Sequence, residues 1–240
     1  DIPASLGTLS DDLPRNRLGL ARWLVDPANP LTARVIVNRY WQMYFGNGLV
    51  KTTEDFGSQG SWPTHPELLD WLAIQLKEND WSLKSLQREI LLSATFRQSS
   101  EVDSQAMQVD ADNRWLWRKS PQRIEAESIR DSILKVAGKL NPEVGGRGYQ
   151  DVKSYFFKGT QFYEPQDPVG EEFNRRSIYR FSARGGRHPL LETFDCPDPS
   201  TTTPDRASTT TPLQALALMN DSFVLRMSDQ LATRVKQRSG

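Results

Sequence analysis

Residues 29–48, NPLTARVIVNRYWQMYFGNG, carry the strongest helix signal in the sequence. Asn29 followed by Pro30 is typical of an N-cap with proline at the first helical position. The segment 31–45 then repeats apolar side chains at helical spacing, and a glycine, a favoured residue for ending a helix, follows it. We therefore predict a helix over 31–45, and signals of the same kind recur along the chain.

These further helix signals cover most of the sequence. Thr64 to Glu67 has the form of a capping box, in which two side chains bond each other's backbone N–H groups. Ser82 is a favoured N-cap for the helix that follows it. The helices predicted on this basis cover 15–25, 31–45, 66–76, 83–95, 121–140, 190–194, 213–219 and 220–235. The polar segment 99–110 is predicted to be a loop, and a short helical turn is expected at Trp115.

The pattern changes in the second half of the chain. Alternating residues predict short strands over 152–157 and 177–183, and the intervening segment 161–170 is predicted to be irregular. The fold class is therefore mainly α, a multi-helix globular domain with a small β element of two or three short strands in the second half.

The chain shows no internal repeat and no long linker. We expect an N-terminal extension over 1–14, a single helical domain over 15–235 and a short tail over 236–240. A subdivision near residue 141, where the composition changes, stays open.

Composition and charge exclude several function classes. The chain of 240 residues has 30 Lys and Arg against 30 Asp and Glu, so a general nucleic-acid binder, which would be basic, is not expected. No uncharged apolar run approaches the length of a membrane span. With one Cys and two His, the chain lacks the ligands for an internal disulfide, a Cys-rich zinc site, a c-type haem site or an iron–sulfur cluster. We therefore predict no metal site and no cofactor.

Charged side chains share one face of the helix predicted over 121–140. Arg123, Glu127, Arg130 and Asp131 follow one another at helical spacing. Glu127 and Asp131 are candidate catalytic carboxylates, because paired acids can supply an acid and a base. The alternative is a ladder of ion pairs that holds this helix to its neighbours.

A second cluster is rich in arginine. Arg180, Arg184 and Arg187 are candidate anion-binding residues, because no acid lies between residues 174 and 191. His188 beside them is a candidate catalytic residue. The alternative is that these arginines pair with acids from other parts of the chain.

Trp62 and His65 stand apart from these two clusters. Trp62 lies in a loop rich in Gly and Pro, where an exposed indole would suit carbohydrate binding. The other tryptophans are expected to pack in the core. His65 is expected to have a structural role at the start of its helix.

Several phrases of the sequence together carry a family resemblance. They are Asn16–Leu24 (NRLGLARWL), 37–41 (VNRYW), 45–50 (FGNGLV), 65–73 (HPELLDWLA), 96–100 (FRQSS), 125–131 (EAESIRD), 175–179 (RRSIY) and 211–216 (TPLQAL). In this order they closely resemble the planctomycete-type domain of unknown function that lies C-terminally in large exported proteins, often after a c-type cytochrome domain.

The resemblance implies a setting rather than an activity. It implies no established catalytic residues, a periplasmic or extracellular location, and a role beside electron transfer or polysaccharide breakdown. The implied partners are neighbouring domains of the parent chain, with a c-type cytochrome domain among them.

Three function classes therefore stay open. The first is a non-catalytic structural or interaction module of a larger exported protein. The second is an enzyme or subdomain that acts on an anionic glycan through the acidic and arginine clusters. The third is a carbohydrate-binding module that uses Trp62.

Overall fold

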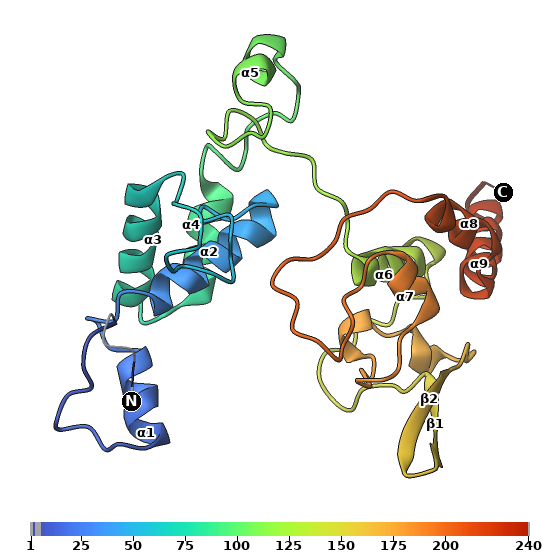
Figure 1. Cartoon of the computed structure of the whole chain (residues 1–240). Coiled ribbons are helices and arrows are strands. Elements are labelled where there is room, and N and C mark those ends of the chain that lie inside the picture. The colour runs from blue at the N-terminus through green and yellow to red at the C-terminus, as the bar shows by residue number, and fades with distance from the viewer. Residues whose placement is uncertain (1, 3–5, 240) are drawn as a thin grey trace. The chain divides into compact units, whose positions relative to one another are not determined.

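The computed structural model describes residue 2 and residues 6–239, and it is mainly helical, as predicted (Figure 1). The chain divides into two compact units, Asp1–Gln122 and Arg123–Gly240. The division lies between residues 122 and 123, whereas the change in composition near residue 141 lies inside the second unit. The single helical domain predicted over 15–235 stays a prediction.

The first unit is built from helices. They are α1 (Arg17–Leu24), α2 (Thr32–Phe45), α3 (Pro66–Glu78), α4 (Leu83–Leu92) and α5 (Ser104–Val109). The helices α2, α3 and α4 pack around one apolar core. Its centre includes Val37, Leu49, Leu76 and Ile90, each at most 2% exposed.

The helix predicted over 31–45 is confirmed as α2, which begins one residue later. The N-cap is Leu31 rather than the predicted Asn29, but the Asn29 side chain still accepts hydrogen bonds from the backbone N–H groups of Leu31 and Thr32 at 3.0 and 3.1 Å. At the other end the backbone of Gly46 has φ +86°, a conformation that residues other than glycine rarely adopt. Ser82 likewise caps α4, accepting the N–H of Ser85.

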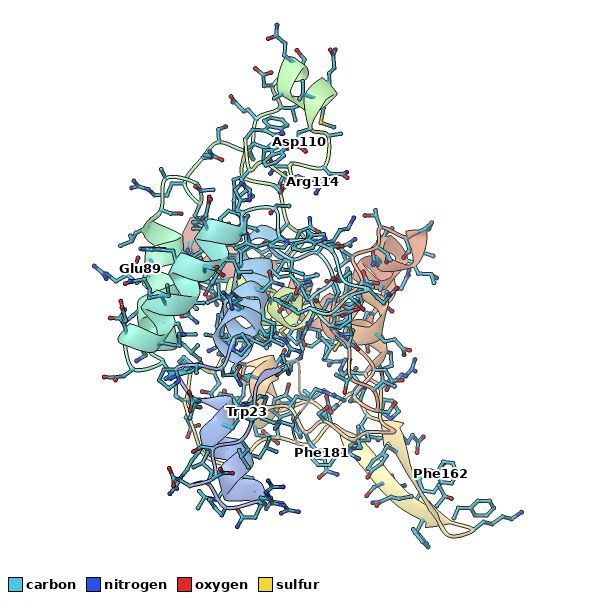
Figure 2. The ribbon with its side chains drawn as sticks, turned by 60° about the vertical axis from the view of Figure 1, so that its left-hand side comes forward. Trp23, Glu89, Asp110, Arg114, Phe162 and Phe181 are labelled. Carbon is cyan, nitrogen blue, oxygen red and sulfur yellow. The ribbon has the colours of Figure 1, made fainter. Side chains whose placement is uncertain are left out.

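Three local predictions in the first unit are wrong. The capping box at Thr64 does not form, because the Thr64 N–H and hydroxyl both bond the carbonyl of Leu49. The predicted loop over 99–110 contains α5, whose N-cap Asp103 accepts two backbone N–H bonds. The segment at Trp115 is a non-helical turn, because the Asp110 carboxylate accepts the N–H groups of the two residues at 114 and 115 (Figure 2).

The second unit has a helical core with one hairpin. Its elements are α6 (Ala126–Ala137), β1 (Val152–Phe157), β2 (Thr160–Pro165), the 3-10 turns η2 (Glu171–Asn174) and η3 (Ser177–Tyr179), α7 (Pro189–Thr193), α8 (Pro212–Asn220) and α9 (Ser222–Ser239). The apolar core joins α6, α7 and the start of α9 through Ala126, Leu190, Leu191 and Val224.

The helix predicted over 121–140 is shorter at both ends. Glu125 is still extended, with ψ 152°, and Gly138 ends α6 in a left-handed conformation. The extended approach lets Arg123 donate hydrogen bonds to Gln214 and Thr210 in the segment that leads into α8.

The β element differs from its prediction in the second strand. The first strand is confirmed as β1, but its antiparallel partner is β2, in the segment predicted to be irregular. Lys158 and Gly159, both with positive φ, form the two-residue turn between them, as tight hairpins require. The strand predicted over 177–183 is wrong: the segment begins with η3, where the Arg180 N–H returns to the Ser177 carbonyl. Figure 2 shows Phe162 on the outer part of this hairpin.

Among the described residues, no helix is long and apolar enough to cross a bilayer.

Candidate functional site

The two polar clusters predicted in the second unit lie together. Asp131 on α6 accepts hydrogen bonds from the backbone N–H and the hydroxyl of Ser177, both at 2.7 Å. The Ser177 hydroxyl also lies 3.3 Å from the Glu127 carbonyl. The acidic face of α6 is therefore attached directly to the arginine-rich segment that begins at residue 175.

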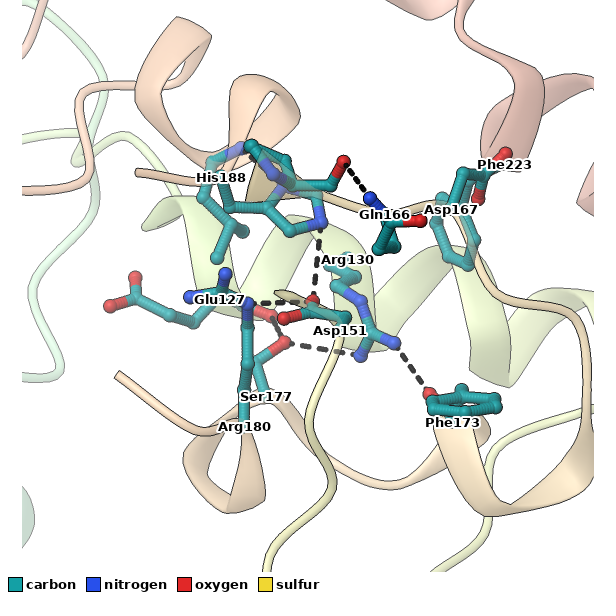
Figure 3. A network of polar contacts seen from close by, with 12 residues as sticks. Glu127, Arg130, Asp151, Gln166, Asp167, Phe173, Ser177, Arg180, His188 and Phe223 are labelled. Atoms are coloured by element: carbon teal, nitrogen blue, oxygen red, sulfur yellow. Dashed lines mark hydrogen bonds and ion pairs between the residues drawn. The ribbon is translucent and has the colours of Figure 1, made fainter. Parts of the chain in front are cut away.

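Arg130 is the buried centre of this contact. Its guanidinium donates to the carbonyls of Arg175 and Phe173, at 3.0 and 2.6 Å. The rings of Tyr149 and Phe223 each lie 5.3 Å from it, so the cation has aromatic neighbours as well as carbonyl acceptors. Arg130 thus connects α6, η2 and α9 and is fully engaged within the fold (Figure 3).

Asp151 forms a buried pair with Arg180. Arg180 Nε donates to Asp151 Oδ2 at 2.7 Å, and the two side chains are 8% and 5% exposed. His188 Nε2 lies 3.6 Å from the same oxygen. Asp151 therefore neutralises one of the three arginines proposed to bind anions (Figure 3).

Both ring nitrogens of His188 are engaged. Nδ1 accepts the N–H of Leu191 at 3.4 Å, which caps α7, so the proton of the neutral ring lies on Nε2 and faces Asp151. Burial lowers the pKa of His188, the cations of Arg180 and Arg130 lower it further, and Asp151 opposes them. A neutral ring without a free nitrogen is poorly suited to take up a proton as a base.

Glu127 is held by an arginine from the loop before α8. Arg206 donates to both carboxylate oxygens of Glu127, at 2.8 and 3.1 Å. Burial would raise the pKa of Glu127, but the hydrogen bonds and charge of Arg206 outweigh it and lower the pKa overall. Cys196 lies 3.7 Å from the same carboxylate, and its own pKa is raised to about 11 by burial and by the Glu127 charge.

The remaining arginines of the cluster are exposed. Arg187 pairs with Glu192 and Asp198 at the surface. Arg184 is exposed and has no polar contact within the part of the chain that the structure describes. Arg184 and Arg187 line one open surface pocket, which Arg180, buried against Asp151, does not line.

A cavity of about 510 Å³ lies against the buried polar cluster. Arg130, Tyr149, Asp151 and His188 belong to its lining, together with residues 165–171 and the start of α9. Its charged lining residues are five acids, Asp151, Asp167, Glu171, Asp221 and Asp229, and three bases, Arg130, Lys139 and Arg226. The cavity next to the arginine-rich segment is thus acidic rather than basic.

Trp62 belongs to a separate cavity in the first unit. Its side chain is 89% exposed at the edge of a cavity of about 370 Å³. Polar side chains such as Asn47, Asp112 and Arg114 also line this cavity. His65 contacts the edge of the Trp115 ring and the Thr64 hydroxyl, in keeping with a structural role.

No group of three or more His, Cys, Asp or Glu side chains among residues 2 and 6–239 is placed to hold a metal ion.

The comparison with protein families gives one match. The family model PSD1, described as a protein of unknown function (DUF1553), matches residues 16–239. The chain belongs to this family. The match includes nearly all of both units, so both units belong to the region that the DUF1553 family model describes. No curated protein and no solved structure matches the chain.

The sequence does not single out two residues of the polar cluster in the second unit. Asp151 and Tyr149 precede β1 and are 4% and 6% exposed. Their only sequence signal is an acid and a tyrosine next to a strand, which is too common a pattern to single them out. Their positions depend on pairing with Arg180 and Arg130, which are distant in the sequence.

Proposed function

We propose that this chain is a non-catalytic interaction module of a larger exported protein. The observation that carries the proposal is the orientation of α8. This helix buries Gln214, at 3% exposure, and exposes Leu213, Leu216 and Met219, at 68%, 51% and 69%. A surface helix of a globular protein usually turns its apolar residues toward the core and its polar residues toward solvent. In α8 a polar residue faces the core and these three apolar residues face solvent.

The hydrogen bonds of Gln214 explain this arrangement. Its side chain accepts from Arg123 at 2.7 Å and from the Thr211 N–H at 3.1 Å, and so completes the capping box of α8. Gln214 is thereby fixed inward, and the three apolar residues at spacing i, i+3 and i+6 face outward together. An exposed apolar face of this kind is typical of a protein–protein contact.

The polar site supports a non-catalytic role. Glu127, Asp131 and His188, the candidate catalytic residues, are each held by at least two contacts within the chain. A general acid or base needs a free position for the substrate's proton. Their contacts instead join α6 to the segments that carry Ser177 and Arg206.

The partner that we propose is a neighbouring domain of the parent chain, with a c-type cytochrome domain as one such neighbour, in the periplasm or at the cell surface. This part rests on the family resemblance. The exposed α8 face supplies the surface that such a domain would cover.

A proteolysis experiment tests the proposal. The parent protein is cut between this chain and its neighbour, and the pieces are passed over a size-exclusion column. We expect the pieces to elute together, and the double variant L216E/M219E to separate them. V144E, at a loop residue that is 83% exposed outside α8, is the matched control and should have no effect. Co-elution of the double-variant pieces would contradict the proposal.

Trp62 supports a second candidate function, carbohydrate binding by the first unit. An indole that is 89% exposed beside a polar cavity offers a flat apolar surface to the face of a sugar ring. Glycan-array screening of the wild type and of Trp62→Ala tests it, because binding that survives the substitution would exclude this site. An enzyme acting on an anionic glycan has less support, because the candidate acids Glu127 and Asp131 do not line the cavity of the second unit and are bonded within the chain.

A further inference from the structure

The hairpin of the second unit is exposed along most of its length. Residues 153–157 of β1 are all exposed, and the side chains of Phe156 and Phe157 are 74% and 56% exposed. Figure 1 shows the two strands pointing away from the helices of their unit. Two strands alone are only marginally stable in water, so a ribbon of this kind with exposed aromatic side chains indicates a further contact.

The outer edge of β1 is open. Its only strand partner within the described residues is β2. The Gln166 N–H bonds the Asp151 carbonyl at 2.8 Å, and hydrogen-bonded pairs alternate along an antiparallel ladder. The backbone groups of residues 153, 155 and 157 therefore point toward β2, whereas those of Ser154 and Phe156 point outward. Such an edge is a template for pairing with another strand.

The outer edge of β2 is less accessible. Pro165 lies opposite Val152 at the end of β2, and it has no N–H to donate at that edge. A Cβ added at Gly186 would lie 3.0 Å from the Cβ of Tyr163, so the loop at residue 186 packs closely on β2. The edge that another strand can reach is therefore that of β1.

We propose that a second copy of this chain pairs with the outer edge of β1, so that two hairpins form one four-stranded antiparallel sheet around a two-fold axis at Tyr155. The proposal does not depend on the α8 face or on Trp62, and it concerns a different part of the molecule.

The exposed length of β1 sets the register. Val152 is buried, and Lys158 leaves the strand with φ +47°, so 153–157 is the part of β1 available for pairing. Tyr155 is the middle of this stretch, and a register centred on it pairs every available residue of both copies. It also places Ser154 opposite Phe156 of the second copy, where their outward backbone groups exchange hydrogen bonds.

The side chains that meet in this register are compatible. Tyr155 stacks on Phe162 at 5.6 Å within one hairpin, and Tyr155 beside its own copy joins the two stacked pairs into one row. Lys153 lies opposite Phe157 of the second copy, which suits a cation–π contact. No two like charges lie directly opposite each other.

An anionic lipid surface has less support as the partner of the hairpin. Such surfaces attract clusters of basic side chains. Glu164 lies opposite Lys153, so Lys158 is the only charge of β1, β2 and their turn that no opposite charge balances.

Sedimentation velocity of the full chain, over a concentration series up to the millimolar range, tests the pairing. The interface is small, so we expect a weak dimer whose average mass rises toward twice that of the monomer. L216E/M219E removes the exposed face of α8 and should dimerise as the wild type does. A monomer at every concentration would overturn the proposal, as would a dimer that L216E/M219E abolishes.

A matched pair of proline variants tests the edge. Ser154→Pro removes an outward N–H of β1 and leaves the bonds between β1 and β2 in place. Gln161→Pro, opposite Phe156, removes an outward N–H at the edge of β2. We expect Ser154→Pro to raise the dimer dissociation constant at least about tenfold and Gln161→Pro to leave it unchanged. Equal dimerisation of the two variants would count against the β1 edge.

A crosslink tests the register. In a Cys196→Ser background, Tyr155→Cys should form a disulfide-linked dimer when oxidised with copper phenanthroline, because the two Cα atoms of such a pair lie about 4.5 Å apart. Phe162→Cys, on the same face of β2, is the control: its two copies lie three strand spacings apart, about 14 Å, which is too far for a disulfide.

Two results of these last experiments would contradict the proposal. One is a Tyr155→Cys dimer that forms no faster than the Phe162→Cys dimer. The other is a chain that stays monomeric but pellets with phosphatidylglycerol vesicles and loses this binding in Phe156→Ser, since the hairpin would then serve a lipid surface.

Discussion

Arg180 Nε lies 2.7 Å from Asp151 Oδ2, and both side chains are less than one-tenth exposed. This pair ties the segment before β1 to the turn after η3, and its acid lines the cavity of the second unit. It also changes the meaning of the arginine-rich segment, because a cation that looks free in the sequence is neutralised in the fold.

The buried pair predicts a large loss of stability when one partner is removed. Arg180→Ala leaves Asp151 as an uncompensated buried charge, which costs about 3–5 kcal/mol of unfolding free energy. The surface pair of Arg226 and Asp167 is much more exposed, so Arg226→Ala should cost only about 0–1 kcal/mol. Urea unfolding of the two variants measures the difference. Similar losses in both would show that the Arg180 pair has no special role.

His188 predicts a pH dependence of stability. Its folded pKa is lowered by burial and by Arg180 and Arg130, against the opposing charges of Asp151 and Asp221. The unfolded chain therefore binds more protons than the folded one once the pH falls below about 6.5. The contribution of His188 to stability is complete above that pH and is lost as the pH falls toward the folded pKa.

His188→Asn should therefore flatten the fall in unfolding free energy between about pH 7 and 5. Asparagine is chosen because it still caps α7. Asn220→Ala, at an exposed residue that does not titrate, is the control and should keep the wild-type slope. A His188→Asn variant with the full wild-type slope would contradict the pKa assignment.

The surroundings of Cys196 predict that its thiol is alkylated slowly. A pKa of about 11, against 9.0 for an ordinary cysteine, leaves roughly a hundredth of the usual thiolate at pH 8. Alkylation by iodoacetamide should be slower in the folded chain by about that factor than in the chain unfolded in urea. Glu127→Gln removes the neighbouring negative charge and should speed the reaction. Equal rates in folded and unfolded protein would refute this prediction.

Asn38 predicts a polar anchor in the core of the first unit. It is fully buried on α2, and its amide bonds the carbonyl and the N–H of Val50 at 2.9 and 2.8 Å. Asn38→Ala leaves both Val50 groups unpaired, at a cost of about 1–3 kcal/mol for each. Asn220→Ala, at an exposed position, should change stability by less than about 0.5 kcal/mol. Thermal unfolding checks both, and a small loss for Asn38→Ala would contradict the anchor.

Local signals in the sequence were sufficient where one residue sets the backbone. Ser82 and Gly46 cap their helices as predicted, and Asn29 bonds the first N–H groups of α2 from two residues before its N-cap, since these contacts depend on neighbours within a few residues. The prediction at Thr64 failed because its hydroxyl and N–H bond Leu49, which is 15 residues away. The strand predicted after residue 177 failed for the same reason, since Asp131 holds Ser177 in a turn.

The candidate site depended even more on distant contacts. The sequence predicted the polar face of α6 and the arginine cluster, and the structure joins the two through Ser177. It could not predict that Asp151 would neutralise Arg180, because the partners are 29 residues apart. The reversed orientation of α8 was also hidden, because it depends on Arg123 reaching Gln214.

The proposed interaction is tested most directly by the unfolding free energy of the L216E/M219E variant, measured both in this chain alone and in the parent protein. If a neighbouring domain covers the α8 face, the variant should match the wild type within about 0.5 kcal/mol in the chain alone. In the parent protein it should lose at least about 3 kcal/mol, because two apolar side chains leave their contact and charges take their place. A loss in the chain alone, or none in the parent protein, would contradict the account.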